Sequence, residues 1–141
     1  MSVRPGDLQR AIEALERQLL DPAVRARHAR VDALVDEAFV AIDTSGGVFG
    51  KAGVPARLPS ERGVAFGAGP IRRLPFRVDA ARVLYAGTRR AGRDARRALR
   101  SSWGCRGADG HRRMVFHQGT SDTGAGTIGD PQITTQAYVP Q

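Results

Sequence analysis

Apolar residues change their spacing once along this 141-residue chain, near Glu37, and that change limits the folds open to it. Before that point, residues 7–20 repeat Leu or Ile at intervals of four, three and four, which is one apolar stripe of an amphipathic helix. After it, short runs rich in Val, Phe and Tyr are separated by Gly, Pro and Asp, as is typical of strands and turns. Helices followed by antiparallel strands predict an α+β fold, with the helices on one face of a curved sheet.

Two more short helices are predicted ahead of the strands. Asp21 can cap a helix that begins at Pro22, because proline fits the first helical position, and that ends near Arg27. A further helix is expected over about residues 29–35, buried through its Val and Leu side chains. Three helices are therefore expected in total.

The strand region is divided by its turn residues. Residues 44–47, Thr-Ser-Gly-Gly, predict a hairpin, and Pro55 and Pro59 allow at most a short helix after it. The expected strands are a broken pair over 63–78, a clearer one over 81–90, and two more over 96–106 and 111–120, joined by a turn at 107–110.

The length and the composition predict one domain over residues 1–120. Residues 121–141 contain neither Lys nor Arg and are rich in Gly and Thr, so we expect a C-terminal tail that is flexible or packs on the sheet or on a partner. No apolar run approaches the roughly 20 residues that span a bilayer, and the N-terminal residues do not have the pattern of a secretory signal. Cys105, the single cysteine, is consistent with a reducing cytoplasm.

Motif searches predict neither a metal nor a cofactor. The sequence SGGVFGKA resembles a phosphate-binding loop, but Ser45 replaces its first glycine and Ala52 follows Lys51 where Ser or Thr is needed. The histidines lie at positions 28, 111 and 117, without the spacing of metal ligands.

The net charge is +8, and the basic residues are densest between Arg89 and Arg100. A solvated basic loop or strand edge is the preferred interpretation, and an anion-binding patch with Arg96, Arg97 and Arg100 as candidates is the alternative. Nucleic acid is not favoured, because aromatic residues make up only 6% of the chain and offer no stacking platform.

Residues 19–52, 81–90 and 99–120 together resemble the nuclear transport factor 2-like superfamily, which includes ketosteroid isomerases and polyketide cyclases. Within it, the likeness is to an uncharacterised bacterial family, and the closing FHQGT is the most specific part. The resemblance implies a cone-shaped fold of three helices against a strongly bent mixed sheet, often dimeric through the sheet face. It does not imply one activity. The chain departs from the pattern at Trp103-Gly104 and at Arg112, which stands where a second Trp is expected.

The last strand presents a question of orientation. If side chains alternate, Met114 and Phe116 face the helices together with Gln118, and His117 lies on the opposite face. The reverse assignment, in which Val115 and His117 face the helices, stays open. His117 is thus a candidate for a structural hydrogen bond, a dimer contact, ligand binding or acid–base chemistry.

Asp43 is the second candidate. It ends the first predicted strand, in AFVAIDTS, and the resemblance implies that the isomerases place a general base near this point. Beside Phe39, its carboxylate could abstract a proton next to a carbonyl, with the Tyr85 phenol as oxyanion donor. A turn-forming role for Asp43 is preferred, since Asp commonly bonds its own backbone ahead of a Gly-rich turn.

Two hypotheses follow. In the first, the cone binds a small, partly apolar ligand, with or without isomerase- or cyclase-like acid–base chemistry. The candidates for its pocket are Phe39, Asp43, Tyr85, Trp103, His117 and Gln118. In the second, the chain is a non-enzymatic homodimeric interaction module that uses its arginines on an anionic partner. The sequence does not decide whether the protein is an enzyme.

Overall fold

The computed structural model describes residues 6–54 and 63–122. Helices α1 (Asp7–Leu20), α2 (Pro22–Arg25) and α3 (His28–Leu34) come first, as predicted. The strands follow: β1 (Val35–Ile42), β2 (Val48–Gly50), β3 (Val64–Ala68), β4 (Arg72–Arg77), β5 (Ala80–Ala91), β6 (Asp94–Arg106) and β7 (Arg112–Ser121). A 3₁₀ turn, η1 (Lys51–Gly53), follows β2. The predicted α+β class is confirmed, and the tail expected from residue 121 lies almost wholly outside the described residues.

The N-terminal helices form where the sequence places their signals. The buried face of α1 carries Ile12, Glu16 and Leu20, one turn apart. Asp21 accepts a hydrogen bond of 2.9 Å from the backbone N–H of Ala23, which caps α2 as expected. The Asp21 cap thus fixes the start of α2, and the buried row of α1 packs that helix against the sheet.

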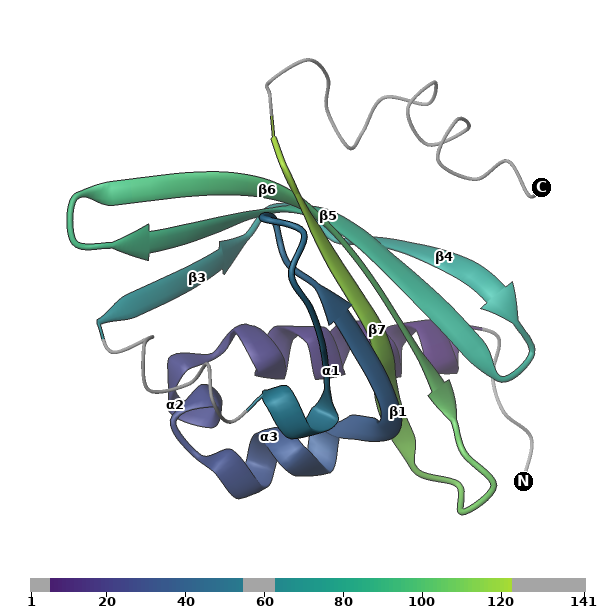
Figure 1. Cartoon of the computed structure of the whole chain (residues 1–141). Coiled ribbons are helices and arrows are strands. Elements are labelled where there is room, and N and C mark those ends of the chain that lie inside the picture. The colour runs from purple at the N-terminus through teal and green to yellow at the C-terminus, as the bar shows by residue number, and fades with distance from the viewer. Residues whose placement is uncertain (1–5, 55–62, 123–141) are drawn as a thin grey trace.

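The seven strands form one mixed sheet in the order β2-β1-β7-β6-β5-β3, with β4 also paired to β5. All neighbours are antiparallel except β1 and β7, which run parallel. Figure 1 shows the long strands β5 and β6 curving over the helices, with α1 lying beneath the sheet. The first and the last strand of the chain are therefore neighbours.

A β-bulge interrupts the pairing of β6 with β7. Trp103 pairs with Phe116, but the next residue, Gly104, pairs with Met114, so Val115 is an extra residue in β7. The bulge breaks the strict alternation of side chains that the sequence suggests. Met114 and His117, which alternation would place on opposite faces, both face the helices and line the same cavity.

The core lies between α1 and the inner face of the sheet. Its fully buried side chains include Ile12, Val35, Val83, Tyr85 and Met114. Burying a large apolar side chain stabilises a fold by roughly 1.5–3 kcal/mol. This layer holds the helices at a fixed distance from the strands.

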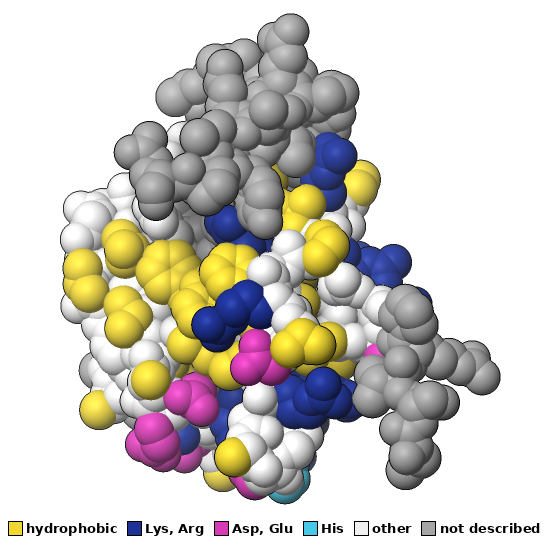
Figure 2. Space-filling view, turned by 90° about the vertical axis from the view of Figure 1, so that its right-hand side faces the viewer, with side chains coloured by type: hydrophobic (Ala, Val, Ile, Leu, Met, Phe, Trp, Pro, Cys, Tyr) yellow, Lys and Arg dark blue, Asp and Glu magenta, His cyan; other side chains and the backbone are white. Residues whose placement is uncertain are grey.

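The outer face of the sheet carries a second, smaller set of aromatic contacts. Phe76 and Trp103 stack with ring centroids 5.5 Å apart, and the guanidinium groups of Arg77 and Arg82 lie over the Phe76 ring. Figure 2 shows the end of the molecule where β4 lies, with hydrophobic side chains gathered in its middle and charged side chains against them. Arginine stems thus cover apolar surface at this end.

No helix among the described residues combines the length and the apolar character that crossing a membrane requires.

Candidate functional site

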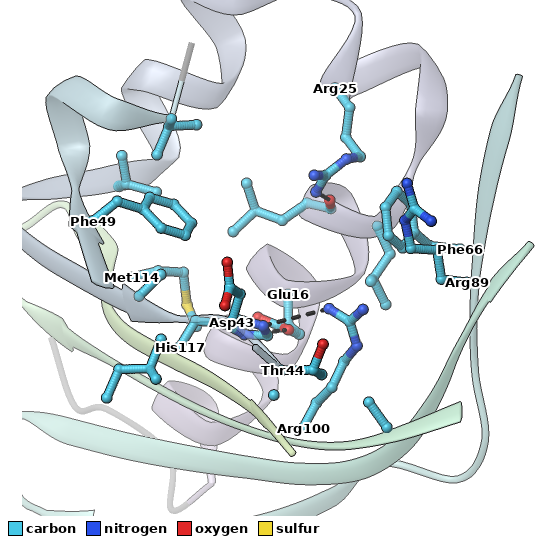
Figure 3. Close-up of a pocket in the computed structure, with 18 of the residues that line it drawn as sticks. Glu16, Arg25, Asp43, Thr44, Phe49, Phe66, Arg89, Arg100, Met114 and His117 are labelled. Carbon is cyan, nitrogen blue, oxygen red and sulfur yellow. Dashed lines mark hydrogen bonds and ion pairs between the residues drawn. The ribbon is translucent and has the colours of Figure 1, made fainter. Parts of the chain in front are cut away.

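A cavity of about 490 Å³ lies between the helices and the inner face of the sheet. Its apolar walls come from α1, β1, β2 and β3, and include Leu19, Leu20, Val35, Phe39, Phe49 and Phe66. Figure 3 shows polar side chains converging on the same space, among them Glu16, Arg25, Arg100 and His117. An apolar cleft with a few convergent polar groups is the usual form of a small-molecule site.

The structure brings part of the predicted set together. Phe39, Asp43 and His117 line the cavity, and so do the three anion candidates Arg96, Arg97 and Arg100.

The remaining candidates lie elsewhere. Tyr85 is fully buried behind the cavity wall, where it bonds Glu16. Trp103 stacks on Phe76 on the outer face, and Gln118 is exposed, so neither lines the cavity. Gln118 faces away because the bulge at Val115 turns His117 inwards.

His117 lies at the centre of the polar cluster. Its Nδ1 is 2.7 Å from Ser102 Oγ and 3.6 Å from Glu16 Oε1, and its Nε2 is 3.4 Å from Arg100 Nη1. A guanidinium can only donate, so Nε2 accepts and the proton of the neutral ring is on Nδ1. Burial lowers the pKa of His117, and Arg100 and Arg25 lower it further against the opposing effect of Glu16. The imidazole is therefore held neutral.

Glu16 is the buried carboxylate of the cavity, with a residue exposure of 3%. Its Oε1 accepts a hydrogen bond of 2.5 Å from the Tyr85 hydroxyl, across 69 positions of the sequence. Burial raises the pKa of Tyr85 far above its ordinary value, and the Glu16 charge raises it further. Tyr85 thus acts as a permanent donor that holds one oxygen of Glu16 in place.

Arg100 reaches the cavity from β6 and is incompletely bonded. Its Nε is buried and has no hydrogen-bond partner among the described residues. The side chain crosses the sheet over Gly87, where an added Cβ would lie 2.7 Å from that Nε. Its guanidinium carbon is 5.6 Å from the centroid of the Phe66 ring, and that of Arg25 is 4.4 Å from the same centroid. Two guanidinium groups therefore share one aromatic ring at the cavity.

Asp43 is engaged in the β1–β2 turn. Its Oδ1 accepts hydrogen bonds from the backbone N–H of Ser45 and of Gly47, at 3.1 and 2.8 Å, and from the Ser45 hydroxyl at 2.7 Å. This is the pattern by which Asp stabilises a turn. The carboxylate borders the cavity while its Oδ1 supports the hairpin.

Cys105 does not line the cavity, and burial raises the pKa of its thiol. Among the described residues, no cluster of three or more His, Cys, Asp or Glu side chains is arranged to hold a metal ion.

Glu16, Arg25 and Ser102 were missed by the sequence reasoning. The burial of Glu16 could have been predicted from the sequence, since it stands four residues after Ile12 and four before Leu20, in the buried row of α1. A carboxylate in such a row needs a partner inside the protein. Arg25 and Ser102 have no comparable signal.

No protein-family model matches this sequence, and no curated protein matches it. Solved structures do match in shape. A protein with a cystatin-like fold from Caulobacter vibrioides superposes with a TM-score of 0.72 at 10% identity, over 93% of this chain and 96% of that one. An NTF2-like protein of unknown function from Pseudomonas aeruginosa gives 0.64 at 19% identity, over 81% and 97%.

A ketosteroid isomerase-like protein from Erwinia carotovora atroseptica gives a TM-score of 0.63 at 18% identity, over 83% of this chain and 98% of that one. At these identities the likeness is one of fold. It covers nearly the full length of each of the three matched proteins.

Proposed function

We propose that this chain, which has the nuclear transport factor 2-like fold, binds a small, partly apolar ligand in the cavity beneath its sheet. The observation that carries the proposal is the cavity itself. Its volume of about 490 Å³ lies within the usual range of ligand pockets. About half of its lining residues are apolar, and four of its polar side chains, Glu16, Arg25, Arg100 and His117, converge on one part of it.

The polar groups give such a ligand an orientation. His117 Nδ1 is 3.6 Å from Glu16 Oε1, and His117 Nε2 is 3.4 Å from Arg100 Nη1. The apolar body of a ligand would contact apolar lining residues such as Leu19, Phe39 and Phe49. Acid–base chemistry here would use Glu16 and His117, because Asp43 Oδ1 is committed to its turn. The proposal is binding, without an assigned reaction.

A cavity-filling variant tests the proposal. Ala98 is buried on the cavity wall of β6, and Ala98→Leu would fill part of the space. Ala95→Leu makes the same change at an exposed position of the same strand and serves as the matched control. Thermal-shift and calorimetric screening with medium-chain and aromatic acids and alcohols should give binders that Ala98→Leu loses and Ala95→Leu keeps. Equal binding to both variants would place the ligands outside the cavity.

The outer sheet face favours a second candidate, a homodimer formed through the sheet. Phe76 is 37% exposed and Val78 is 91% exposed, beside the Phe76–Trp103 stack. A Phe76→Glu variant should shift the molecular mass measured by light scattering from dimer to monomer. A monomeric wild-type protein would exclude this candidate.

A further inference from the structure

We propose that the cavity takes a ligand bearing a carboxylate, that this carboxylate binds Arg100, and that its binding draws one proton onto His117. The inference rests on the proposed function and deepens it, since it names the charged group of the ligand and couples its binding to solvent protons.

The first argument is the bonding of Arg100. Its buried Nε has no hydrogen-bond partner in the part of the chain that the structure describes, and its Nη1 donates a long hydrogen bond of 3.4 Å to His117 Nε2. Among the described residues, Arg100 forms no salt bridge. A guanidinium presents paired N–H donors that match a carboxylate in a bidentate arrangement. A ligand carboxylate would therefore satisfy a donor, the Arg100 Nε–H, that the described residues leave unbonded.

The second argument is the charge of the cavity. Its lining includes the cationic side chains of Arg25, Arg89, Arg96, Arg97 and Arg100 against the carboxylates of Glu16 and Asp43. Glu16 Oε1 accepts a hydrogen bond from Tyr85, and Asp43 Oδ1 accepts hydrogen bonds within its turn.

The arginines of the cavity differ in their ion pairs. Arg96 pairs with Asp94 and Arg97 with Asp122, whereas Arg100 has no such partner among the described residues. Arg100 thus brings to the cavity a positive charge that no carboxylate of the described residues pairs with, and such a charge attracts an anion.

The third argument concerns His117. The groups that face it are Glu16 from α1, Arg25 from α2, and Arg100 and Ser102 from β6. Tyr85 from β5 lies behind Glu16, and Asp43 borders the same cavity from the end of β1. Nε2 of His117 accepts a hydrogen bond from Arg100 Nη1, which is compatible only with a neutral ring.

Two conditions keep His117 neutral, the positive charge of Arg100 and the hydrogen bond that Nε2 accepts from it, and a carboxylate bound to Arg100 would change both. It would neutralise the charge that opposes protonation, and it would draw the guanidinium away from Nε2. A proton from solvent could then occupy Nε2, and the imidazolium would lie between the ligand anion and Glu16, 3.6 Å from its Nδ1. No bond other than this N–H is formed.

The experiment compares acids with their matching alcohols. Titration calorimetry with octanoate against 1-octanol, and with phenylacetate against 2-phenylethanol, should show a preference for each acid of about tenfold or more. Arg100→Gln should abolish that preference, while Arg112→Gln, exposed and outside the cavity, should retain it. Repeating the octanoate titration in buffers of different ionisation enthalpy should show net proton uptake, which His117→Gln removes.

Imidazole NMR gives a second readout. Octanoate should raise the pKa of His117, with the exposed His28 and His111 as internal references in the same spectrum. Affinity for octanoate should fall as pH rises through the His117 pKa of the complex, by at most about tenfold per pH unit for one proton.

The outcomes separate the two proposals. If neither acids nor alcohols bind, the proposed function fails and this inference fails with it. If acids and alcohols bind equally, or if acids bind without proton uptake, the ligand pocket stands and this inference is overturned.

Discussion

The hydroxyl of Tyr85 donates a hydrogen bond of 2.5 Å to Glu16, and this bond joins strand β5 to the first helix. Tyr85→Phe would leave the carboxylate without that donor while keeping the ring in the core. Because a buried acceptor that loses its partner is not resolvated, we expect the free energy of unfolding to fall by about 1–3 kcal/mol. Urea denaturation measures this difference.

The double variant Glu16→Leu/Tyr85→Phe is the control for this bond. Replacing both partners by apolar groups removes the unsatisfied carboxylate, so much of the lost stability should return. An additive loss in the double variant would show that the two residues act independently.

The stability of the protein should depend on pH through His117. Burial, together with Arg100 and Arg25, holds the pKa of His117 below its ordinary value of 6.5 in the folded protein. The unfolded chain then takes up the proton at a higher pH than the folded protein, so the free energy of unfolding falls as pH drops from above 6.5 towards the lower, folded pKa. Below the folded pKa the contribution is constant.

His117→Gln removes this dependence. The difference in unfolding free energy between wild type and His117→Gln should decline over that pH window in urea titrations. His28→Gln, at an exposed position, should keep the dependence that His117 contributes. A flat difference between wild type and His117→Gln would mean that the imidazole titrates alike in both states.

Gly87 sets the path of the Arg100 side chain. In Gly87→Ala, the new Cβ would lie 2.7 Å from Arg100 Nε and 2.8 Å from its Cδ, so the arginine must move. We expect the preference for octanoate over 1-octanol to be lost with the fold retained, as calorimetry and circular dichroism would show. Gly69→Ala is the matched control, since the nearest atom there is 3.5 Å away.

Asp43 should act on stability through its turn. Asp43→Ala removes the acceptor of three hydrogen bonds in the β1–β2 hairpin, which should cost about 1–2 kcal/mol of unfolding free energy. Asp43→Asn keeps the Oδ1 acceptor and should recover most of that loss. If Asn were as destabilising as Ala, the charge rather than the turn geometry would be responsible.

Much of the fold follows from local patterns. The apolar stripe of residues 7–20, the Asp21-Pro22 helix start and the 44–47 turn each depend on residues within a few positions of one another, and all three appear in the structure. Such signals are physical properties of a short segment and do not need the rest of the chain.

The site depends on relationships that local patterns do not contain. The orientation of His117 was ambiguous because alternation assumes a regular strand, whereas Val115 is an extra residue opposite β6. The partner of Tyr85 is 69 residues away on a helix, and only the finished sheet brings Glu16 to it. The apolar and basic residues that meet at Phe66 come from α2, β3 and β6.

The parallel pairing of β1 with β7 has a consequence for how the protein is made. Within the sheet, β1 is joined to β2 on one side and to β7 on the other, so only the last strand links it to β6 and β5. While β7 is still being synthesised, the β1–β2 hairpin is therefore not hydrogen-bonded to strands β3 to β6, and the sheet that forms the cavity wall is incomplete. Contacts this distant in sequence form slowly, so we expect ligand binding to appear late and in a single step, when β7 inserts between its neighbours.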